Sequence, residues 1–258
     1  MKCQAPTVFF GHGSPTNAID DNRYTRALCA FGARVIKPQA ILMVSAHWET
    51  EGTWVTGMDQ PKTIHDFRGF PEELYQIQYP APGDPRLAVD IANAIPGVSV
   101  EMMKWGLDHG TWAVLRHVFP AADVPIIQLS LDMTKPLSQH LELGRRLRPV
   151  REHGVMIVGS GNIVHNLRQI DWDRDAKPHG WNEEFDQWVA DHIRKRDFEP
   201  LISMARQTPA GQLSIPTLEH YLPLLYVLGA SDEADTMEFI FEGYQNASMS
   251  MRCVSFGV

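Results

Sequence analysis

Four short apolar runs alternate with segments whose apolar residues recur at helical spacing. The runs are 7–10, 40–45, 124–131 and 155–158, and each is bounded by Gly, Pro or polar residues, as is typical of strands buried on both faces. Helical patterns follow at 24–35, 85–94, 111–119 and 136–150. This alternation predicts an α/β fold with a mixed, mostly parallel central sheet and helices on both of its faces.

The second half of the chain is less regular. Helical patterns cover 182–196 and 217–228, and the second of these is interpreted as an amphipathic helix that follows Pro216. Segments 236–244 and 249–258 are predicted to be two strands paired through the turn between them. Segment 52–57 is expected to be an antiparallel companion of the second strand. We find no internal repeat, low-complexity tract or linker, so one domain is predicted over residues 1–258.

Histidines stand where the predicted strands end. His12 follows the first run in GHGSP, and His47 follows the second in SAHWE. His109 lies in LDHGTW ahead of a helix, and His165 lies in GSGNIVHNL after the fourth run. Because ligands of open α/β sheets bind beyond the carboxyl ends of the strands, we expect these four side chains to meet at that edge.

The remaining histidines divide into one candidate and six ordinary residues. His220 lies in EHYLPLLY beside Glu219, near the start of a predicted helix. The six in polar or helical contexts are interpreted as surface or packing residues: His65, His117, His140, His153, His179 and His192. Imidazole is the commonest protein ligand of intermediate transition metals. Two histidines with a carboxylate suit an open iron(II) site, whereas three histidines and a water suit zinc, and the residues alone leave both open.

Several neighbouring motifs have structural interpretations. Ser14 follows Gly13 and precedes Pro15, so it is expected to shape a turn and not to be the nucleophile of a GxSxG elbow. The GxG after the fourth run is expected to be a tight strand exit, because the rest of a phosphate-binding fingerprint is missing. Asp108 either orients His109 or caps the helix that follows. The tryptophans at 48, 105 and 112 are expected in the core, with an aromatic pocket as the alternative.

Composition narrows the functional class. The formal charge of −8 and the lack of a long basic run argue against a nucleic-acid partner. Three widely spaced cysteines, Cys3, Cys29 and Cys253, predict no disulfide framework and a reducing compartment. No apolar stretch is long enough to span a membrane. A cytoplasmic protein without a membrane partner is therefore expected.

Five motifs carry a family resemblance. GHGSP, SAHWE, LDHGTW, GSGNIVHNL and EHYLPLLY occur in this order over nearly the whole chain and resemble the 4,5-DOPA extradiol dioxygenase family. That family belongs to the class III extradiol group, which includes the catalytic subunit of protocatechuate 4,5-dioxygenase. The resemblance implies a metal-dependent enzyme whose partners are a small-molecule catechol, such as DOPA opened between carbons 4 and 5, and dioxygen. It implies Fe(II) as the catalytic cofactor, with Zn(II) as the alternative bound metal.

The same resemblance implies roles for individual residues. His12 and His47 would be metal ligands, and His220 would be the third. Glu219 is the alternative third ligand, because protocatechuate-type relatives use a glutamate there. His165 would be either a further ligand or the acid/base that moves the hydroxyl proton, and His109 would be a catalytic histidine near the substrate.

Two other functions use the same residues. A zinc hydrolase would use a histidine-rich site to activate water instead of dioxygen. A non-catalytic binding protein like the Memo-type relatives would keep the fold without the chemistry. No coiled-coil seam or apolar interface patch predicts an oligomeric state.

Overall fold

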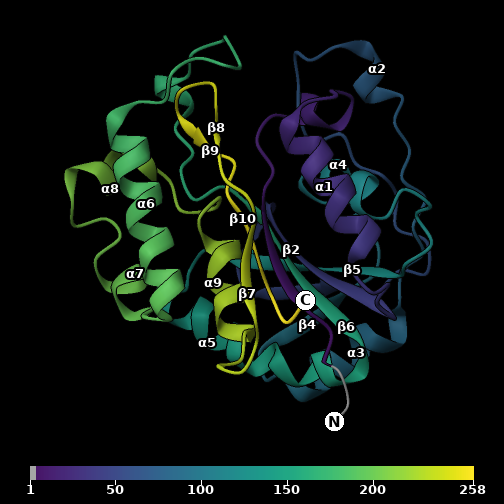
Figure 1. Ribbon diagram of the computed structural model, residues 1–258. Coiled ribbons are helices and arrows are strands. Elements are labelled where there is room, and N and C mark those ends of the chain that lie inside the picture. Colours follow the sequence, from purple (N-terminus) through teal and green to yellow (C-terminus); the bar gives the residue numbers. More distant parts are fainter. Residues whose placement is uncertain (1–3) are drawn as a thin grey trace.

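The computed structural model describes residues 4–258, so Cys3 lies outside the described residues. Eight strands form one sheet in the order β4-β3-β5-β2-β6-β1-β10-β7, and two further strands form a small hairpin (Figure 1). The strands are β1 (Thr7–Gly11), β2 (Ala40–Thr50), β3 (Thr53–Thr56), β4 (Val98–Glu101), β5 (Ile126–Asp132), β6 (Val155–Gly161), β7 (Met237–Phe241), β8 (Tyr244–Gln245), β9 (Met249–Ser250) and β10 (Cys253–Phe256).

The centre of the sheet is parallel. β5, β2, β6 and β1 run side by side in one direction, while β10 pairs antiparallel with β1 and β3 pairs antiparallel with β5. The four apolar runs of the sequence are these four central strands, and they are buried because both of their faces are covered by helices. The predicted mixed, mostly parallel α/β fold is confirmed.

Segment 52–57 was expected to pair with the second strand, and this expectation is wrong. β3 lies in that segment, but it pairs antiparallel with β5 and parallel with β4. The reason is that β2 pairs with β5 along one edge and with β6 along the other, which leaves it no free edge. The returning chain therefore joins the next open edge, which belongs to β5.

Helices cover both faces of the sheet. The α-helices are α1 (Arg23–Arg34), α2 (Glu72–Tyr75), α3 (Pro85–Ala94), α4 (His109–Val118), α5 (Leu137–Leu147), α6 (Gly180–Lys195), α7 (Glu199–Ser203), α8 (Pro209–Ser214) and α9 (Leu222–Ala230). Three 3₁₀ turns are η1 (Pro15–Ala18), η2 (Arg148–His153) and η3 (Leu167–Gln169). Val8 and Phe10 of β1 face the core under α1 and α4, whereas Phe9 faces the core under α5 and α9. This alternation follows from the two-residue period of a strand.

Helix boundaries differ from the sequence patterns at two places. The pattern over 136–150 is α5 followed by η2, because Pro149 has no amide hydrogen with which to continue an α-helix. The expected amphipathic helix over 217–228 begins only at Leu222, and all nine residues of α9 are buried. It is apolar all round because it lies between α5 and the sheet, and that position suits a helix without a polar face.

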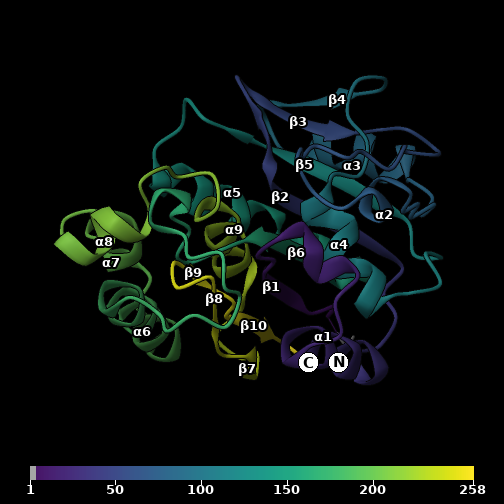
Figure 2. The same cartoon turned by 90° about the horizontal axis from the view of Figure 1, so that it is seen from above.

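The C-terminal strands reach over the carboxyl edge of the sheet. β7 and β10 pair antiparallel as predicted, and the chain between them forms the β8–β9 hairpin. Asp186 of α6 accepts hydrogen bonds from Arg252 and from the Ser250 hydroxyl, which fixes this hairpin beside α6. In the view from above, α6, α7 and α8 form a group to one side of the sheet, next to the hairpin (Figure 2).

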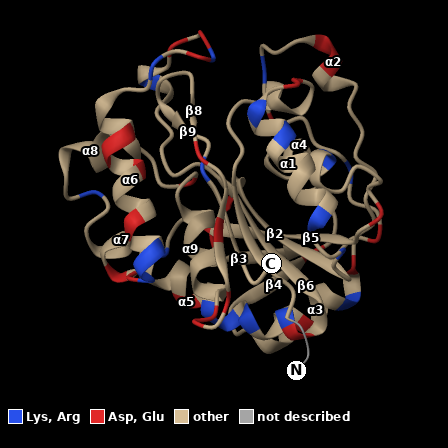
Figure 3. Cartoon of the chain, in the orientation of Figure 1, with Lys and Arg blue, Asp and Glu red and all other residues tan. Residues whose placement is uncertain are grey.

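Charged residues lie mainly on the outer helices and loops, and along α6 the acidic residues precede the basic ones, which lie in its last turn (Figure 3). Among residues 4–258, no helix is long and apolar enough to cross a lipid bilayer. Cys29 is exposed and Cys253 is buried, and both are free thiols.

Candidate metal centre

His12 is held by a relay of hydrogen bonds that fixes its tautomer. It follows the last residue of β1, and its Nδ1 lies 2.9 Å from Ser160 Oγ at the end of β6. The Ser160 hydroxyl donates its single proton to the Gly110 carbonyl at 2.5 Å, so its oxygen accepts from the His12 ring. The proton of His12 is therefore on Nδ1, and the lone pair of Nε2 faces the other histidines.

His47 lies inside β2, not after its end as the sequence suggested. Val44 pairs with Leu129 of β5, and the next pair joins Glu49 to Leu131, so β2 advances five residues while β5 advances two. Such a bulge re-aims side chains at the rim of a sheet. His47 sits in the bulge, and its Nε2 lies 3.3 Å from Nε2 of His12.

His220 completes a group of three. It lies in the turn before α9, and its ring centroid is 5.2 Å from those of both His12 and His47. One nitrogen from each of the three rings lies within 4.8 Å of the others. Imidazole nitrogens sit about 2.0–2.1 Å from a bound zinc ion, so two nitrogens on one metal lie up to about 4 Å apart. A small closure of these side chains would let all three reach one ion.

The three imidazoles are neutral, as metal ligands must be. Burial lowers the pKa of His12 and of His220 well below the usual histidine value, and the neighbouring imidazoles add to the effect. Burial and nearby His109 lower the pKa of His47 to about 3. Three free lone pairs in a buried group fit a divalent transition metal, and a tetrahedral or octahedral ion would keep open positions toward the cleft.

Glu219 lies behind His220. Its carboxylate oxygen is 3.0 Å from Nδ1 of His220, the arrangement that orients metal-binding histidines in many sites. Glu219, His220 and His165 form a second group in which one ligand atom from each lies within 4.8 Å of the others. The hydrogen bond to Nδ1 therefore favours His220 as the third ligand, with Glu219 orienting its ring. It argues against Glu219 itself as the third ligand.

Asp66 is a site residue that the sequence reasoning missed. It lies in the loop between β3 and α2, and its carboxylate accepts from both the backbone N–H and Nδ1 of His109 at 2.8 Å. The same carboxylate lies 3.5 Å from Nδ1 of His47. Burial alone would raise the pKa of Asp66, but the bonds from His109 and the nearby His47 bring it to about 2. Asp66 therefore stays ionised and holds two rings, and no hydrogen bond within residues 4–258 holds Nε2 of His109, which lines the cleft.

His165 stands face to face with His220. The two rings are parallel within 9°, and their centroids are 3.5 Å apart. Among the described residues, no hydrogen bond holds the ring nitrogens of His165, in contrast to those of His12, His109 and His220. Burial lowers its pKa to about 4, against the opposing effect of the Glu219 carboxylate. Its imidazole is thus neutral and available to accept a proton.

The helix-capping interpretation of Asp108 is correct. Its carboxylate accepts from the backbone N–H of Thr111, and also from the Ser45 hydroxyl. Gly110, in the first turn of α4, lets this turn approach β2, because a Cβ at this position would lie 2.5 Å from Ser45 Oγ and 2.9 Å from the His47 ring. Ser14 shapes a turn as expected, since it caps η1 by accepting from Thr16 N–H.

The five histidines line the floor of a cleft of ≈ 580 Å³. Its walls are largely apolar: Pro15, Phe67, Phe70, Leu167, Ile170, Trp172 and Met249. The exposed Trp172 was not singled out from the sequence. Trp48 and Trp105 stack on each other at 5.8 Å, and Trp112 is buried in the core, so these three tryptophans do not line the cleft.

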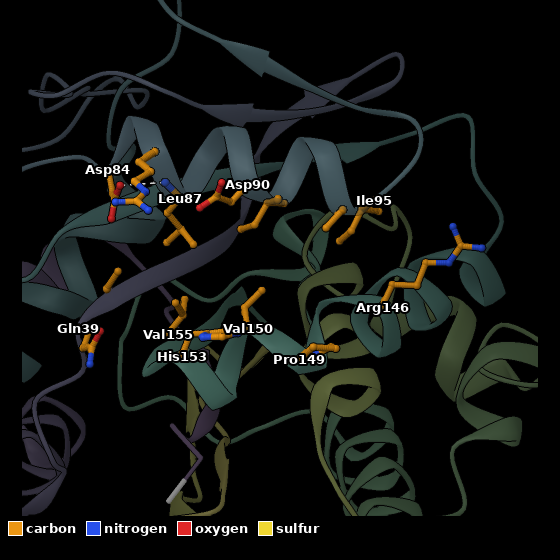
Figure 4. Close-up of a pocket in the computed structure, with 14 residues that line it drawn as sticks. Gln39, Asp84, Leu87, Asp90, Ile95, Arg146, Pro149, Val150, His153 and Val155 are labelled. Carbon is orange, nitrogen blue, oxygen red and sulfur yellow. Dashed lines mark hydrogen bonds between the residues drawn. The ribbon is translucent and has the colours of Figure 1, made fainter. Parts of the chain in front are cut away.

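A larger cavity, of ≈ 730 Å³, lies at the opposite edge, where β2 and β6 begin (Figure 4). It lies between α3 and η2, and Leu87, Val150 and Val155 point into it. His153 is the single histidine among its lining residues in the described chain. In the described chain, no group of potential metal ligands within reach of one another includes His153, so the candidate chemistry belongs to the smaller cleft.

The buried imidazoles predict how stability depends on pH in the metal-free protein. An unfolded histidine titrates near about pH 6.5, whereas the folded values are about 3 for His47 and about 4 for His165. The unfolded state therefore binds more protons as the pH falls below about 6.5, and the free energy of unfolding decreases. We expect the urea midpoint to drop between about pH 7 and 5, with a smaller drop in His165→Gln. Equal drops in both proteins would contradict the buried, neutral state of His165.

Comparisons with known proteins agree with one another. Residues 13–257 match the family described as the catalytic LigB subunit of aromatic ring-opening dioxygenase. The 4,5-DOPA dioxygenase extradiol of Escherichia coli (strain K12) is 46% identical over 258 aligned residues, which cover 98% of this chain and 94% of that protein. The 4,5-DOPA dioxygenase extradiol of Beta vulgaris is 35% identical, with coverages of 97% and 96%. A crystal structure of an uncharacterized protein from Escherichia coli K12 matches with a TM-score of 0.85 and 41% identity, over 98% of this chain and 99% of that chain.

Proposed function

The chain belongs to the LigB family of aromatic ring-opening dioxygenases, and from this premise we propose that it opens a catechol ring in the extradiol position with dioxygen. The family resemblance of the five motifs is thereby confirmed. The observation that carries the proposed reaction is the group formed by His12, His47 and His220, three neutral imidazoles at the floor of an apolar cleft. We assign these three as the metal ligands.

Iron(II) in this group would bind the two adjacent hydroxyls of a catechol and activate dioxygen at a neighbouring position. The protein supplies what surrounds that chemistry. Phe67 and Phe70 form an apolar wall for the ring, and apolar surroundings strengthen the electrostatic interactions of the bound hydroxyls. The loss of water from the cleft would also protect the reactive ring from side reactions.

Proton transfer is assigned to His165. Its neutral ring accepts the proton of a substrate hydroxyl, and the nearby Glu219 carboxylate stabilises the imidazolium that results. The same ring can later return this proton to an oxygen of the opened product. His109, held through Nδ1 by Asp66, presents a free Nε2 as acceptor for the second hydroxyl.

An isotope experiment separates the proposed dioxygenase from a hydrolase. With the iron-loaded protein, L-DOPA and ¹⁸O-labelled dioxygen, both labelled atoms should enter the ring-opened product. A zinc hydrolase would take its oxygen from water and would turn over without dioxygen. A ring-opened product without ¹⁸O label would contradict the proposal. If the protein took up no metal and opened no catechol, the non-catalytic binding alternative would be favoured.

Asp66→Asn tests the support of the metal centre. The amide keeps the size of the side chain but loses the charge that holds Nδ1–H on His109 and lies close to His47. Loss of such a support costs about 10- to 100-fold in metal affinity or activity. Competition with a chelator measures the affinity, and Asp59→Asn, an exposed aspartate outside the cleft, is the matched control. An unchanged affinity and an unchanged rate would remove Asp66 from the site.

A further inference from the structure

One ion pair sits in the cleft. Among its lining residues in the described part of the chain, Asp20 and Arg174 are the two charged side chains besides the histidines. Nη1 of Arg174 lies 3.0 Å from Oδ2 of Asp20. Their side chains are 39% and 30% exposed, whereas His12 and His220 on the floor are 3% and 8% exposed. The pair therefore lies toward the solvent side of the same cleft.

Backbone contacts hold both members in place. The backbone N–H of Asp20 donates to the Thr16 carbonyl, and the Asp20 carbonyl accepts from the Thr25 hydroxyl at the start of α1. On the other side, the Arg174 carbonyl accepts from the backbone N–H of Asn246 in the β8–β9 hairpin. The two charges thus come from separate walls of the cleft, and each wall is fixed independently.

We propose that Asp20 and Arg174 bind the charged head group of a catechol amino acid whose ring lies over the histidines. The guanidinium of Arg174 pairs with the substrate carboxylate, and the carboxylate of Asp20 pairs with its ammonium group. This assignment rests on the proposed ring-opening function and names two residues that would determine how the reaction selects among catechols with differently charged side chains. A zwitterionic head group contacts both Asp20 and Arg174. A ring substituent with a single charge would contact one of them and leave the other without a ligand partner.

Four catechols distinguish the two contacts. L-DOPA carries both head-group charges, 3-(3,4-dihydroxyphenyl)propionate carries the carboxylate alone, dopamine carries the ammonium alone, and 4-methylcatechol carries neither. Arg174→Gln should weaken the binding of the carboxylate-bearing compounds relative to 4-methylcatechol. Asp20→Asn should weaken the binding of the ammonium-bearing compounds. We expect each loss to be about tenfold, because charge-assisted hydrogen bonds at partly exposed positions lie at the lower end of their range.

The test has two readouts, and one of them does not depend on turnover. Oxygen uptake gives kcat/KM for each compound, and calorimetry without oxygen gives Kd for the same metal-loaded proteins. Matched controls are Arg168→Gln, an exposed arginine in the same loop as Arg174, and Asp21→Asn, whose carboxylate pairs with Arg26 outside the cleft. Neither control should alter the ranking of the four compounds.

The decisive result is a different loss in each variant: Arg174→Gln weakens the carboxylate-bearing compounds, whereas Asp20→Asn weakens the ammonium-bearing ones. If Arg174→Gln and Asp20→Asn each changed all four compounds by the same factor, the pair would only brace the two walls, and the inference would be wrong. Turnover of the four catechols without a preference for L-DOPA would also overturn it, while the ring-opening function would stand. If no catechol were cleaved, the proposed function would fail, and the Kd values would still decide whether the pair binds the head group.

Discussion

His47→Ala is expected to remove tight metal binding and to reduce ring cleavage to the background rate. His47 supplies one of three neutral nitrogens, and its Nε2 lies 3.3 Å from that of His12. Loss of a residue that merely supports a metal ligand costs about 10- to 100-fold in affinity, so loss of a ligand should exceed about 100-fold. Metal content after dialysis against a weak chelator, together with oxygen uptake on a catechol, measures both effects.

His153→Ala is the matched control for this experiment. It removes an exposed imidazole that lines the opposite cavity, so metal content and turnover should stay at the parent level. Circular dichroism and a urea unfolding curve would show that both variants keep the fold. A folded His47→Ala protein that retained metal and full turnover would rule out His47 as a ligand.

His165→Gln is expected to lower kcat by about 10²- to 10⁴-fold, the range over which a positioned acid/base contributes. Metal content and substrate Kd should change little, because the ring of His165 lies beside His220 and outside the group of three. The experiment also decides between the two roles that the sequence left open. If His165 were a further ligand, the variant would lose metal together with rate.

His220→Gln provides the comparison for that variant. Both substitutions remove one ring from a stacked pair whose centroids are 3.5 Å apart, so their effects on local packing are similar. Loss of metal in His220→Gln alone would separate the ligand from the acid/base. Loss of metal in neither variant, with Glu219→Gln losing it instead, would make Glu219 the third ligand.

The central strands and part of the site could be predicted because they rest on local patterns. An apolar run that ends in a Gly or polar turn marks a strand and its carboxyl end in the same few residues, which is why His12 and His165 could be assigned to one edge of the sheet. The order of strands depends on which edges remain free after long-range pairing. The partner of β3 therefore could not be inferred from its own sequence.

Other site features depend on contacts distant in sequence. His47 faces the cleft because β2 bulges against β5, and the run AILMVSAHWE carries no signal for that bulge. Asp66 lies in an irregular loop and meets His109 from 43 residues away. Ser160 fixes the tautomer of His12 across 148 residues. Residue type identifies such groups as capable of hydrogen bonding, but only the fold selects their partners.

The most direct measurement is oxygen uptake after anaerobic reconstitution with Fe(II), started by adding L-DOPA, with zinc-loaded protein and iron-treated His47→Ala alongside. We expect uptake and a ring-opened product from the iron-loaded parent protein, and from neither of the other two samples. No uptake by the iron-loaded protein with L-DOPA or with simpler catechols would contradict the ring-opening function, and turnover by the zinc-loaded protein without dioxygen would assign the site to hydrolysis.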